Sequence, residues 1–269
     1  MSNRLTQQLD IDYPIIQAPM AGVSTPELAA AVSGAGALGS LGLGSATIEQ
    51  AETLINRTRR LTTRPFNVNL FCHAPAVRDP QREARWLARL RPEFARFGSL
   101  PPETLAEIYL SFQQQPRMAE LLLDLTPAAV SFHFGVPDRE TLRQLREKGI
   151  VTLASATSVA EALLAVEQGI DMVVAQGYEA GGHRGIFDPL APDGQMSTFT
   201  LVQTIRRHTD IPLIAAGGVM DGAGINSVMN LGADGAQLGT AFLLCPESST
   251  DGGYREALKS ASDGQTVLT

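Results

Sequence analysis

Cysteine is scarce in this chain, and so are the long apolar runs that membrane segments require. Only Cys72 and Cys245 occur among the 269 residues, which excludes a disulfide scaffold and suits a reducing compartment. No run reaches the ~18 apolar residues of a membrane helix, and the N-terminal stretch lacks the apolar core of a signal peptide. We therefore expect a cytoplasmic protein without membrane contact.

Positive charge is also limited. The chain has 21 Lys and Arg against 28 Asp and Glu, a net charge of −7. An acidic balance disfavours a nucleic-acid partner, because phosphate backbones bind basic surfaces. Any site for an anion must therefore be built from local donors.

Several catalytic and metal-binding motifs are missing as well. The Cys and His residues do not have zinc-site spacing, which predicts no metal, and no G-x-S-x-G nucleophile elbow is present. Gly34 and Gly36 precede a predicted strand instead of following one, so they do not form a dinucleotide-binding G-x-G-x-x-G turn. These absences favour a bound, phosphate-bearing cofactor as the source of the chemistry.

Short apolar runs recur along the chain with helical patterns between them. Strands buried on both faces have such runs, and intervening helices indicate parallel strands. We predict an α/β fold, a (β/α)8 TIM barrel built as one domain over residues 1–269; an open doubly wound sheet is the second interpretation. The eight predicted strands are residues 14–20, 37–42, 66–71, 128–135, 150–156, 170–177, 212–218 and 235–243.

Three S/T-x-x-E/Q patterns mark predicted helix starts. In this pattern the two side chains satisfy backbone N–H groups of the first helical turn. The pairs are Ser24 with Glu27, Thr47 with Gln50, and Ser158 with Glu161. Each pair follows a predicted strand, as the barrel requires.

The connection between the third and fourth predicted strands is unusually long. It has about 56 residues, whereas loops in α/β units usually have about 2–6. We predict a helical insertion over residues 73–127, with an Arg-rich solvated face or, as the functional alternative, a lid over the site. The residues at helical spacing are Trp86, Leu90, Phe94 and Phe97 in one predicted helix, and Leu105, Ile108, Tyr109 and Phe112 in another.

Glycines gather at the ends of the last two predicted strands. Gly217 and Gly218 end the seventh, and Gly239 precedes Thr240 in the eighth. In TIM barrels these two loops commonly bind phosphate, and glycine lets backbone N–H groups approach its oxygens. A tight turn without a ligand is the structural alternative for the glycine pair.

His183 is the first of two histidines near predicted strand ends. It lies in a loop with Gly181, Gly182 and Gly185, where packing does not explain a histidine. It is a candidate acid–base or anion-binding group, and an exposed loop histidine is the alternative.

His133 is the second histidine near a predicted strand end. Strand alternation predicts that Ser131 and His133 face the barrel interior and that Phe132 and Phe134 face the other side. A histidine satisfied within the core is the competing interpretation.

Six segments of the chain together resemble the nitronate monooxygenases, formerly called 2-nitropropane dioxygenases, and their bacterial class I branch in particular. They are PIIQAPMAGVSTPELAAAV, FNVNLF, SFHFG, AQGYEAGGHRG, PLIAAGGV and GADGAQLGTAF. The resemblance implies an FMN-dependent TIM-barrel enzyme. It implies that an alkyl nitronate, typically propionate 3-nitronate, reacts with O₂ to give a carbonyl compound and nitrite or nitrate.

The resemblance also implies roles for individual residues. His183 is implied to face the nitronate, with His133, Tyr109 and Tyr254 lining the same pocket as further catalytic residues. A nitronate is already an anion, so it needs hydrogen-bond donors and not a strong base. The implied FMN-binding residues are Ala18, Pro19, Met20, Asn69, Gln176, Gly181, Gly217, Gly218, Gln237, Leu238, Gly239 and Thr240.

The sequence departs from the family pattern at two places. A related branch has a histidine at the end of strand five, where this chain has Ala154, Ser155 and Ala156, so direct deprotonation of neutral nitroalkanes is not expected. Family members continue past strand eight with a basic segment and helices that cover the flavin. We expect this C-terminal family segment to be absent here.

Other functions stay open on the sequence alone. A flavin-dependent enoyl-ACP reductase or an NAD(P)H-dependent flavin reductase of the same superfamily shares the EAGGH-like loop and the phosphate loops, although SFHFG favours the monooxygenase branch. A non-catalytic flavin binder and a flavin-free barrel acting on phosphorylated metabolites are further alternatives. The expected partners are a small nitronate and O₂, and the expected assembly is a monomer or a homodimer.

Overall fold

The computed structural model describes residues 3–261, and its centre is one sheet of eight parallel strands. The strands follow the order β1-β8-β7-β6-β5-β4-β3-β2, and a parallel bridge between Ile16 and Leu38 joins the two edges. The predicted TIM barrel is therefore confirmed. The strands are β1 (Ile15–Gln17), β2 (Gly39–Gly42), β3 (Phe66–Phe71), β4 (Ala129–His133), β5 (Val151–Ala156), β6 (Met172–Gln176), β7 (Leu213–Ala216) and β8 (Gly235–Leu238).

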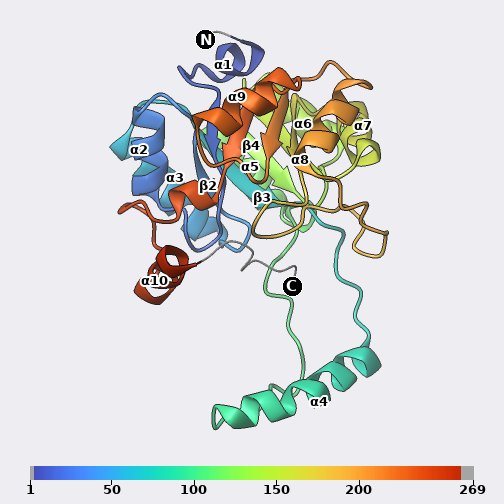
Figure 1. The fold of residues 1–269 in the computed structure, drawn as a ribbon. Coiled ribbons are helices and arrows are strands. Elements are labelled where there is room, and N and C mark those ends of the chain that lie inside the picture. The colour runs from blue at the N-terminus through green and yellow to red at the C-terminus, as the bar shows by residue number, and fades with distance from the viewer. Residues whose placement is uncertain (1–2, 262–269) are drawn as a thin grey trace.

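Helices alternate with the strands and surround the sheet (Figure 1). Within the described part of the chain, none is long and apolar enough to cross a bilayer. The helices are α1 (Arg4–Leu9), α2 (Pro26–Gly34), α3 (Ile48–Leu61), α4 (Pro80–Arg96), α5 (Pro116–Leu125), α6 (Arg139–Glu147), α7 (Val159–Gln168), α8 (Thr198–Arg206), α9 (Gly222–Asn230) and α10 (Gly252–Ser260), with 3₁₀ turns η1 (Phe112–Gln114) and η2 (Thr240–Phe242).

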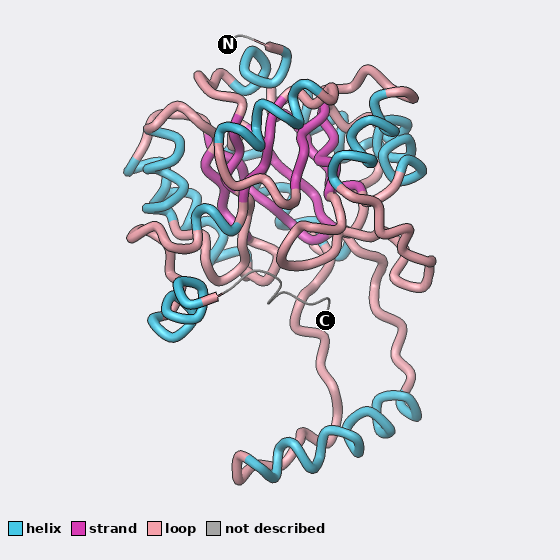
Figure 2. The backbone as a smooth tube through the Cα atoms, viewed as in Figure 1, coloured by secondary structure: helices cyan, strands magenta, loops and turns pink. Residues whose placement is uncertain are grey.

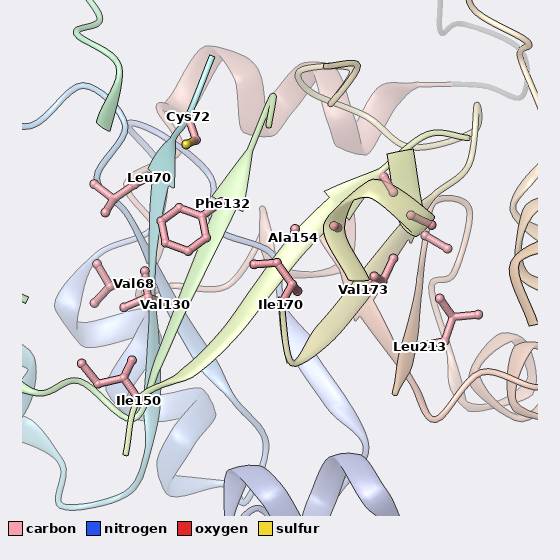
Figure 3. Close-up of a cluster of buried hydrophobic side chains, with 14 of the residues drawn as sticks. Val68, Leu70, Cys72, Val130, Phe132, Ile150, Ala154, Ile170, Val173 and Leu213 are labelled. Atoms are coloured by element: carbon pink, nitrogen blue, oxygen red, sulfur yellow. The ribbon is translucent and has the colours of Figure 1, made fainter. Parts of the chain in front are cut away.

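The core has an outer layer and an inner layer. Strand alternation turns Val68, Leu70 and Phe132 outward into the cluster between the sheet and the helices (Figure 3). A second cluster fills the barrel interior, where Leu5 and Leu9 of α1 join strand residues near the N-terminal mouth. The short helix α1 thus closes that end, and the polar residues gather at the other.

Two of the predicted capping pairs can be compared directly with the structure. Thr47 and Gln50 form the complete reciprocal capping box at the start of α3. The pair beginning at Ser24 is wrong by one position, because Thr25 is the N-cap of α2 and accepts from the backbone N–H of Leu28. Pro26 at the first helical position favours this start, since its fixed φ suits the first turn.

The long connection between β3 and β4 contains α4, η1 and α5. Helix α5 packs against α3 and α6 as part of the barrel wall, whereas α4 stands away from the barrel on two lengths of coil (Figures 1 and 2).

The predicted helix through Leu105 and Tyr109 is wrong. Residues 97–111 form no helix, and side chains take up their carbonyl groups instead. Arg78 donates to the Leu105 carbonyl, and the His73 ring pairs with the Tyr109 carbonyl at 3.2 Å. Phe112 begins only the short turn η1.

Candidate active site

A network of amide and hydroxyl groups lies inside the barrel below its C-terminal rim. The side-chain amide of Asn67 donates to Ser40 Oγ (3.1 Å) and Ser131 Oγ (2.9 Å), and that of Asn69 donates to Ser131 Oγ (2.9 Å). Asn67 Oδ1 is buried and has no hydrogen-bond partner within the described residues. Buried acceptors are normally paired, so this oxygen fits a bound group that brings an N–H donor.

Aromatic rings gather at the rim above this network. The His183 ring lies edge-on to Phe71, with ring centroids 5.5 Å apart, and 5.6 Å from the Phe134 ring. Tyr109 lies on the other side of Phe71 at 5.8 Å, again edge-on. The structure therefore brings His183, His133 and Tyr109, three of the four residues for which the resemblance implies a common pocket, together around Phe71.

The prediction that Phe134 faces away from the barrel interior is wrong, because its ring packs against His133 and Phe71. Its backbone has φ +70°, in the left-handed region, because β4 ends at His133 and the chain turns there. The ring then packs 4.5 Å from His133 and 5.0 Å from Phe71, measured between ring centroids. Strand alternation holds for Phe132 but ends one residue before Phe134.

His133 uses both of its ring nitrogens within the protein. Nδ1 lies 2.9 Å from Ser155 Oγ, and Nε2 lies 3.1 Å from the His183 carbonyl oxygen. Burial lowers the pKa of His133 to about 4, so the ring is neutral at physiological pH. The carbonyl can only accept, which assigns the proton to Nε2 and makes Nδ1 the acceptor for the Ser155 hydroxyl.

The backbone on either side of His183 is fixed by Gln176. Its amide nitrogen donates to the His183 carbonyl (2.8 Å), and its amide oxygen accepts from the Gly185 backbone N–H (2.7 Å). The imidazole of His183 itself is exposed. The loop therefore presents a ring on an ordered backbone, the arrangement that a preorganised donor needs.

An ion pair holds the same loop from outside. Arg184 donates two hydrogen bonds of 2.9 Å to the two carboxylate oxygens of Asp193, and a third of 2.6 Å to the Gln176 carbonyl. Both side chains are mostly buried, with 15% and 22% exposed. Hydrogen bonding from Arg184 lowers the pKa of Asp193, so the carboxylate stays charged and the pair intact.

Glu161 adds a further anchor and explains an incomplete capping box. Ser158 caps α7 by accepting from the Glu161 backbone N–H. The Glu161 carboxylate, however, accepts from Thr157 and from the backbone N–H of Phe187 (2.8 Å). The side chain that the pattern assigned to the helix cap instead holds the loop after β6.

The two glycines after β7 have different constraints. A Cβ on Gly217 would lie 2.8 Å from the Ala180 backbone nitrogen and from Thr198 Oγ1, so packing alone requires glycine there. Gly218 has φ +69° and is exposed, and a Cβ there would meet Glu179 only at 3.4 Å. The tight-turn alternative thus explains Gly217 but not the open position of Gly218.

Residues of three distant segments meet beside Gly239. A Cβ on Gly239 would lie 3.6 Å from Ala18 Cβ and 4.0 Å from Met20 Sδ. A Cβ on Gly181 would lie 3.9 Å from Thr240 Oγ1. Neither the Gly218 nor the Gly239 backbone N–H donates to an acceptor within residues 3–261, so both remain available for phosphate oxygens.

The remaining predicted cofactor residues line the end of the barrel around β1 and β8. Gln237 and Leu238 pair with Ile16 and Gln17 across the two strands, and Pro19 follows in the turn after β1. Leu238 is buried and its carbonyl accepts from the Ala18 backbone N–H, so only its backbone is close to the rim.

Tyr254 is not brought into the aromatic cluster. It lies on α10 with 48% of its surface exposed, and no contact within the described residues joins its ring to His183. No group of three or more metal-binding side chains occurs in that part of the chain either.

Sequence reasoning missed Phe71, Ser155 and the partner of Arg184. Phe71 had a usable signal, because it shares the inward parity of Asn67 and Asn69 along β3. Asp193 had none, since its pairing depends on how the loop after β6 folds back nine residues later.

Comparison with known proteins places these features in a family. The model of the nitronate monooxygenase family matches residues 2–269. The chain belongs to the nitronate monooxygenase family. It is 52% identical to the nitronate monooxygenase of Pseudomonas aeruginosa over 269 residues, which cover all of this chain and 77% of the relative.

Two further matches agree with this assignment. The nitronate monooxygenase of Paraburkholderia phytofirmans is 52% identical, with 97% of this chain and 71% of the relative covered. The crystal structure of nitroalkane oxidase from Streptomyces ansochromogenes superposes with a TM-score of 0.86 at 41% identity, covering 94% of this chain and 72% of that one. FabK from Thermotoga maritima is similar at lower identity, 30%, with a TM-score of 0.77, covering all of this chain and 71% of that one. Nitronate monooxygenases are oxidoreductases, and this chain is an enzyme of that family.

Proposed function

We propose that this enzyme binds FMN at the C-terminal rim of the barrel and oxidises alkyl nitronates with O₂ to a carbonyl compound and nitrite or nitrate. The observation that carries the proposal is the placement of His183. Its exposed ring packs against Phe71, which ends β3, while Gln176 and the Arg184–Asp193 pair hold the loop backbone. The family assignment supplies the reaction class.

The glycine loops fit the cofactor's phosphate. The backbone N–H groups of Gly218 and Gly239 are available for its oxygens, and Thr240 adds a hydroxyl on an exposed surface. We assign the ring of the flavin to the surface formed by residues 18–20, Asn69, Gln176, Gly181 and residues 237–238. Bound FMN would supply the one-electron oxidation and the reaction with O₂.

His183 serves as a hydrogen-bond donor to the anionic nitronate. The acidic protein provides no general attraction for an anion, so a local donor must supply it. His133 acts on His183 and not on the substrate, because its two nitrogens are already bonded to Ser155 and to the His183 carbonyl. Tyr109 borders the same pocket beside Phe71.

The end of β5 supports a nitronate over a neutral nitroalkane as substrate. Ser155 is the only polar side chain among residues 154–156, and its hydroxyl is engaged by His133. A neutral nitroalkane needs a base to remove its α-proton, and no base is present at this strand end. Propionate 3-nitronate is the substrate we assign first, following the sequence resemblance.

Anaerobic stopped-flow mixing tests the proposal. We expect FMN-loaded enzyme to be reduced on mixing with propionate 3-nitronate and not with NADPH, and aerobic turnover to release nitrite. Rapid flavin reduction by NADPH with no response to the nitronate would support an enoyl-ACP or flavin reductase instead. Purified protein that neither contains nor takes up a flavin would rule out all three functions.

A matched histidine pair tests the site. We expect His183→Asn to lower kcat/KM for the nitronate at least about tenfold with FMN still bound, because one placed donor contributes ~1–4 kcal/mol. His208→Asn is the control, since His208 is exposed just after α8, and the one hydrogen-bond partner of its ring within residues 3–261 is the Thr204 carbonyl. Equal activity of both variants would refute the role of His183.

A further inference from the structure

Exposed apolar side chains concentrate on one projecting segment, residues 73–111, which we call the arm. Trp86 is 49% exposed, Ile108 73% and Phe97 82%. Exposed apolar surface, where it gathers in one place, marks sites of protein association. The exposed apolar residues of the arm are Val77, Trp86, Phe97, Leu100, Leu105, Ile108, Tyr109 and Leu110.

The arm is an ordered unit, although it stands away from the barrel (Figures 1 and 2). Asp79 caps α4 by accepting from the Arg82 backbone N–H, and Leu87 of the same helix is only 8% exposed. Arg78 ties the returning coil to α4 through the Leu105 carbonyl and also pairs with Glu83. The arm therefore presents a defined surface.

The charge of α4 is opposite to that of the rest of the molecule. The helix carries five Arg and two Glu in a chain of net charge −7. Arg82, Arg85 and Arg91 are exposed and have no acidic partner within the described residues. The two acidic residues of the returning coil, Glu103 and Glu107, lie outside the helix.

A groove with acidic residues in its lining offers a surface of opposite charge. It lies among α5, α6, α7 and the turn after β4, where Phe134 of the aromatic cluster also lines it, and it has a volume of about 830 Å³. Leu123, Val136 and Phe187 are among its apolar lining residues, and Gln144 and Gln168 are among its polar ones. Its only charged lining residues in the described chain are Glu120 and Asp138, both acidic. Cys72 and Phe112, which flank the two ends of the arm, also line it.

We propose that α4 of one copy docks in this groove on a second copy, so that two molecules exchange arms around a two-fold axis. A second copy fits because one chain carries both surfaces: the Arg-rich helix α4 with the exposed ring of Trp86, and a groove whose charged lining residues are acidic. Reciprocal docking then satisfies both pairs of surfaces at once and closes the assembly. This proposal is independent of the reaction proposed above.

The first test uses Trp86, the only Trp in the chain. We expect light scattering to show a dimer, and the Trp emission maximum to shift to shorter wavelength as protein concentration rises and the ring becomes buried. Trp86→Glu should raise the dimer dissociation constant at least about tenfold. Leu61→Glu, at a site equally exposed at 50% on α3, should leave the dimer unchanged.

The second test locates the contact. In a Cys245→Ser background, Arg85→Cys and Gln144→Cys variants are mixed and treated with a short bismaleimide. Cys72 stays inert, because it is buried and burial raises its pKa to about 12. We expect a covalent dimer in the mixture and much less with either variant alone.

Three results would overturn the proposal. They are a wild-type monomer at every concentration up to about 100 μM, far above the range of stable homodimers, a dimer that Trp86→Glu leaves intact, and an absence of the mixed cross-link. Cross-linking within a single chain that carries both cysteines, with no dimer, would show instead that the arm folds back on its own barrel.

Discussion

Two long segments leave the rim of the barrel, the loop over residues 177–197 and the arm. They differ in how they are bonded to the rest of the chain. The loop over residues 177–197 is tied down by Gln176, Glu161 and the Arg184–Asp193 pair. The arm has a similar share of aromatic residues, but most of its apolar side chains face solvent. Aromatic content alone therefore does not distinguish a preorganised site from an association surface.

The difference lies in where the polar groups find their partners. In the loop after β6, the His183 carbonyl accepts from the side-chain amide of Gln176, and Arg184 donates to the Gln176 carbonyl, so the loop is bonded directly to β6. In the arm, the recorded ion pairs Arg78–Glu83 and Arg96–Glu93 stay within the segment. The loop is bonded to the barrel, whereas the ion pairs of α4 and its flanking coil hold the arm only to itself.

The strongest test of this contrast removes the outer anchor of the loop. We expect Arg184→Met to lower kcat/KM for the nitronate about 100-fold, because breaking a mostly buried ion pair costs ~3 kcal/mol and frees the His183 backbone. Arg143→Met is the matched control. It removes exposed ion pairs on α6, which contribute under ~1 kcal/mol, and should change activity less than twofold. Similar losses in both variants would contradict the anchoring role.

Acid pH tests the contact that His133 makes with the His183 carbonyl inside the barrel. The unfolded state takes up a proton on His133 near pH 6.5, but the folded state does so only near its pKa of about 4. Unfolding free energy should therefore fall as pH drops from 6.5 to 4, by at most about 3 kcal/mol from this residue. Urea unfolding of the apoprotein over this range, compared with His133→Asn, measures the effect. The variant should lack this part of the pH dependence, and identical pH profiles would exclude it.

Gly218→Ala tests the phosphate loop. We expect the FMN dissociation constant to rise at least about tenfold, because loss of ~1.4 kcal/mol of phosphate contact corresponds to that factor. Gly149→Ala is the control for backbone strain, since Gly149 has φ +75° and open space around it on the far side of α6. Titration of both apoproteins with FMN measures the two dissociation constants. An equal rise in both variants would attribute the effect of Gly218→Ala to backbone strain alone.

The smallest effect is expected from the arm. Trp86→Glu should change kcat/KM per FMN-loaded subunit less than twofold, because its ring lies outside the aromatic cluster around Phe71. Steady-state assays at fixed flavin content provide the measurement. A loss as large as that of Arg184→Met would mean that α4 also belongs to the active site.

Much of the barrel was predictable because buried parallel strands impose a continuous apolar pattern. That pattern identified all eight strands, and alternation correctly placed His133 inside. It failed where the strand stopped, at Phe134, since a left-handed turn there depends on the neighbouring rings. The helix predicted through Leu105 failed for a related reason, because side chains from Arg78 and His73 compete for the carbonyl groups.

The site was predictable only in part. Glycines and His183 stand out because few packing roles explain them in loops, whereas Asp193 and Ser155 resemble ordinary surface and strand residues. Their importance comes from contacts over nine and 22 positions of sequence, which no local pattern encodes. The opposite roles of Gly217 and Gly218 likewise depend on Thr198 and Ala180, which only the fold brings near.

The N-terminal helix α1 limits where small molecules can enter the barrel. Leu5 and Leu9 fill one mouth of the barrel, and Arg4 ties the helix down by pairing with Asp234. That end of the barrel is therefore closed within residues 3–261. In the reaction proposed above, substrate, O₂ and both products would all pass the rim beside His183, so slow release of a product would delay binding of the next substrate.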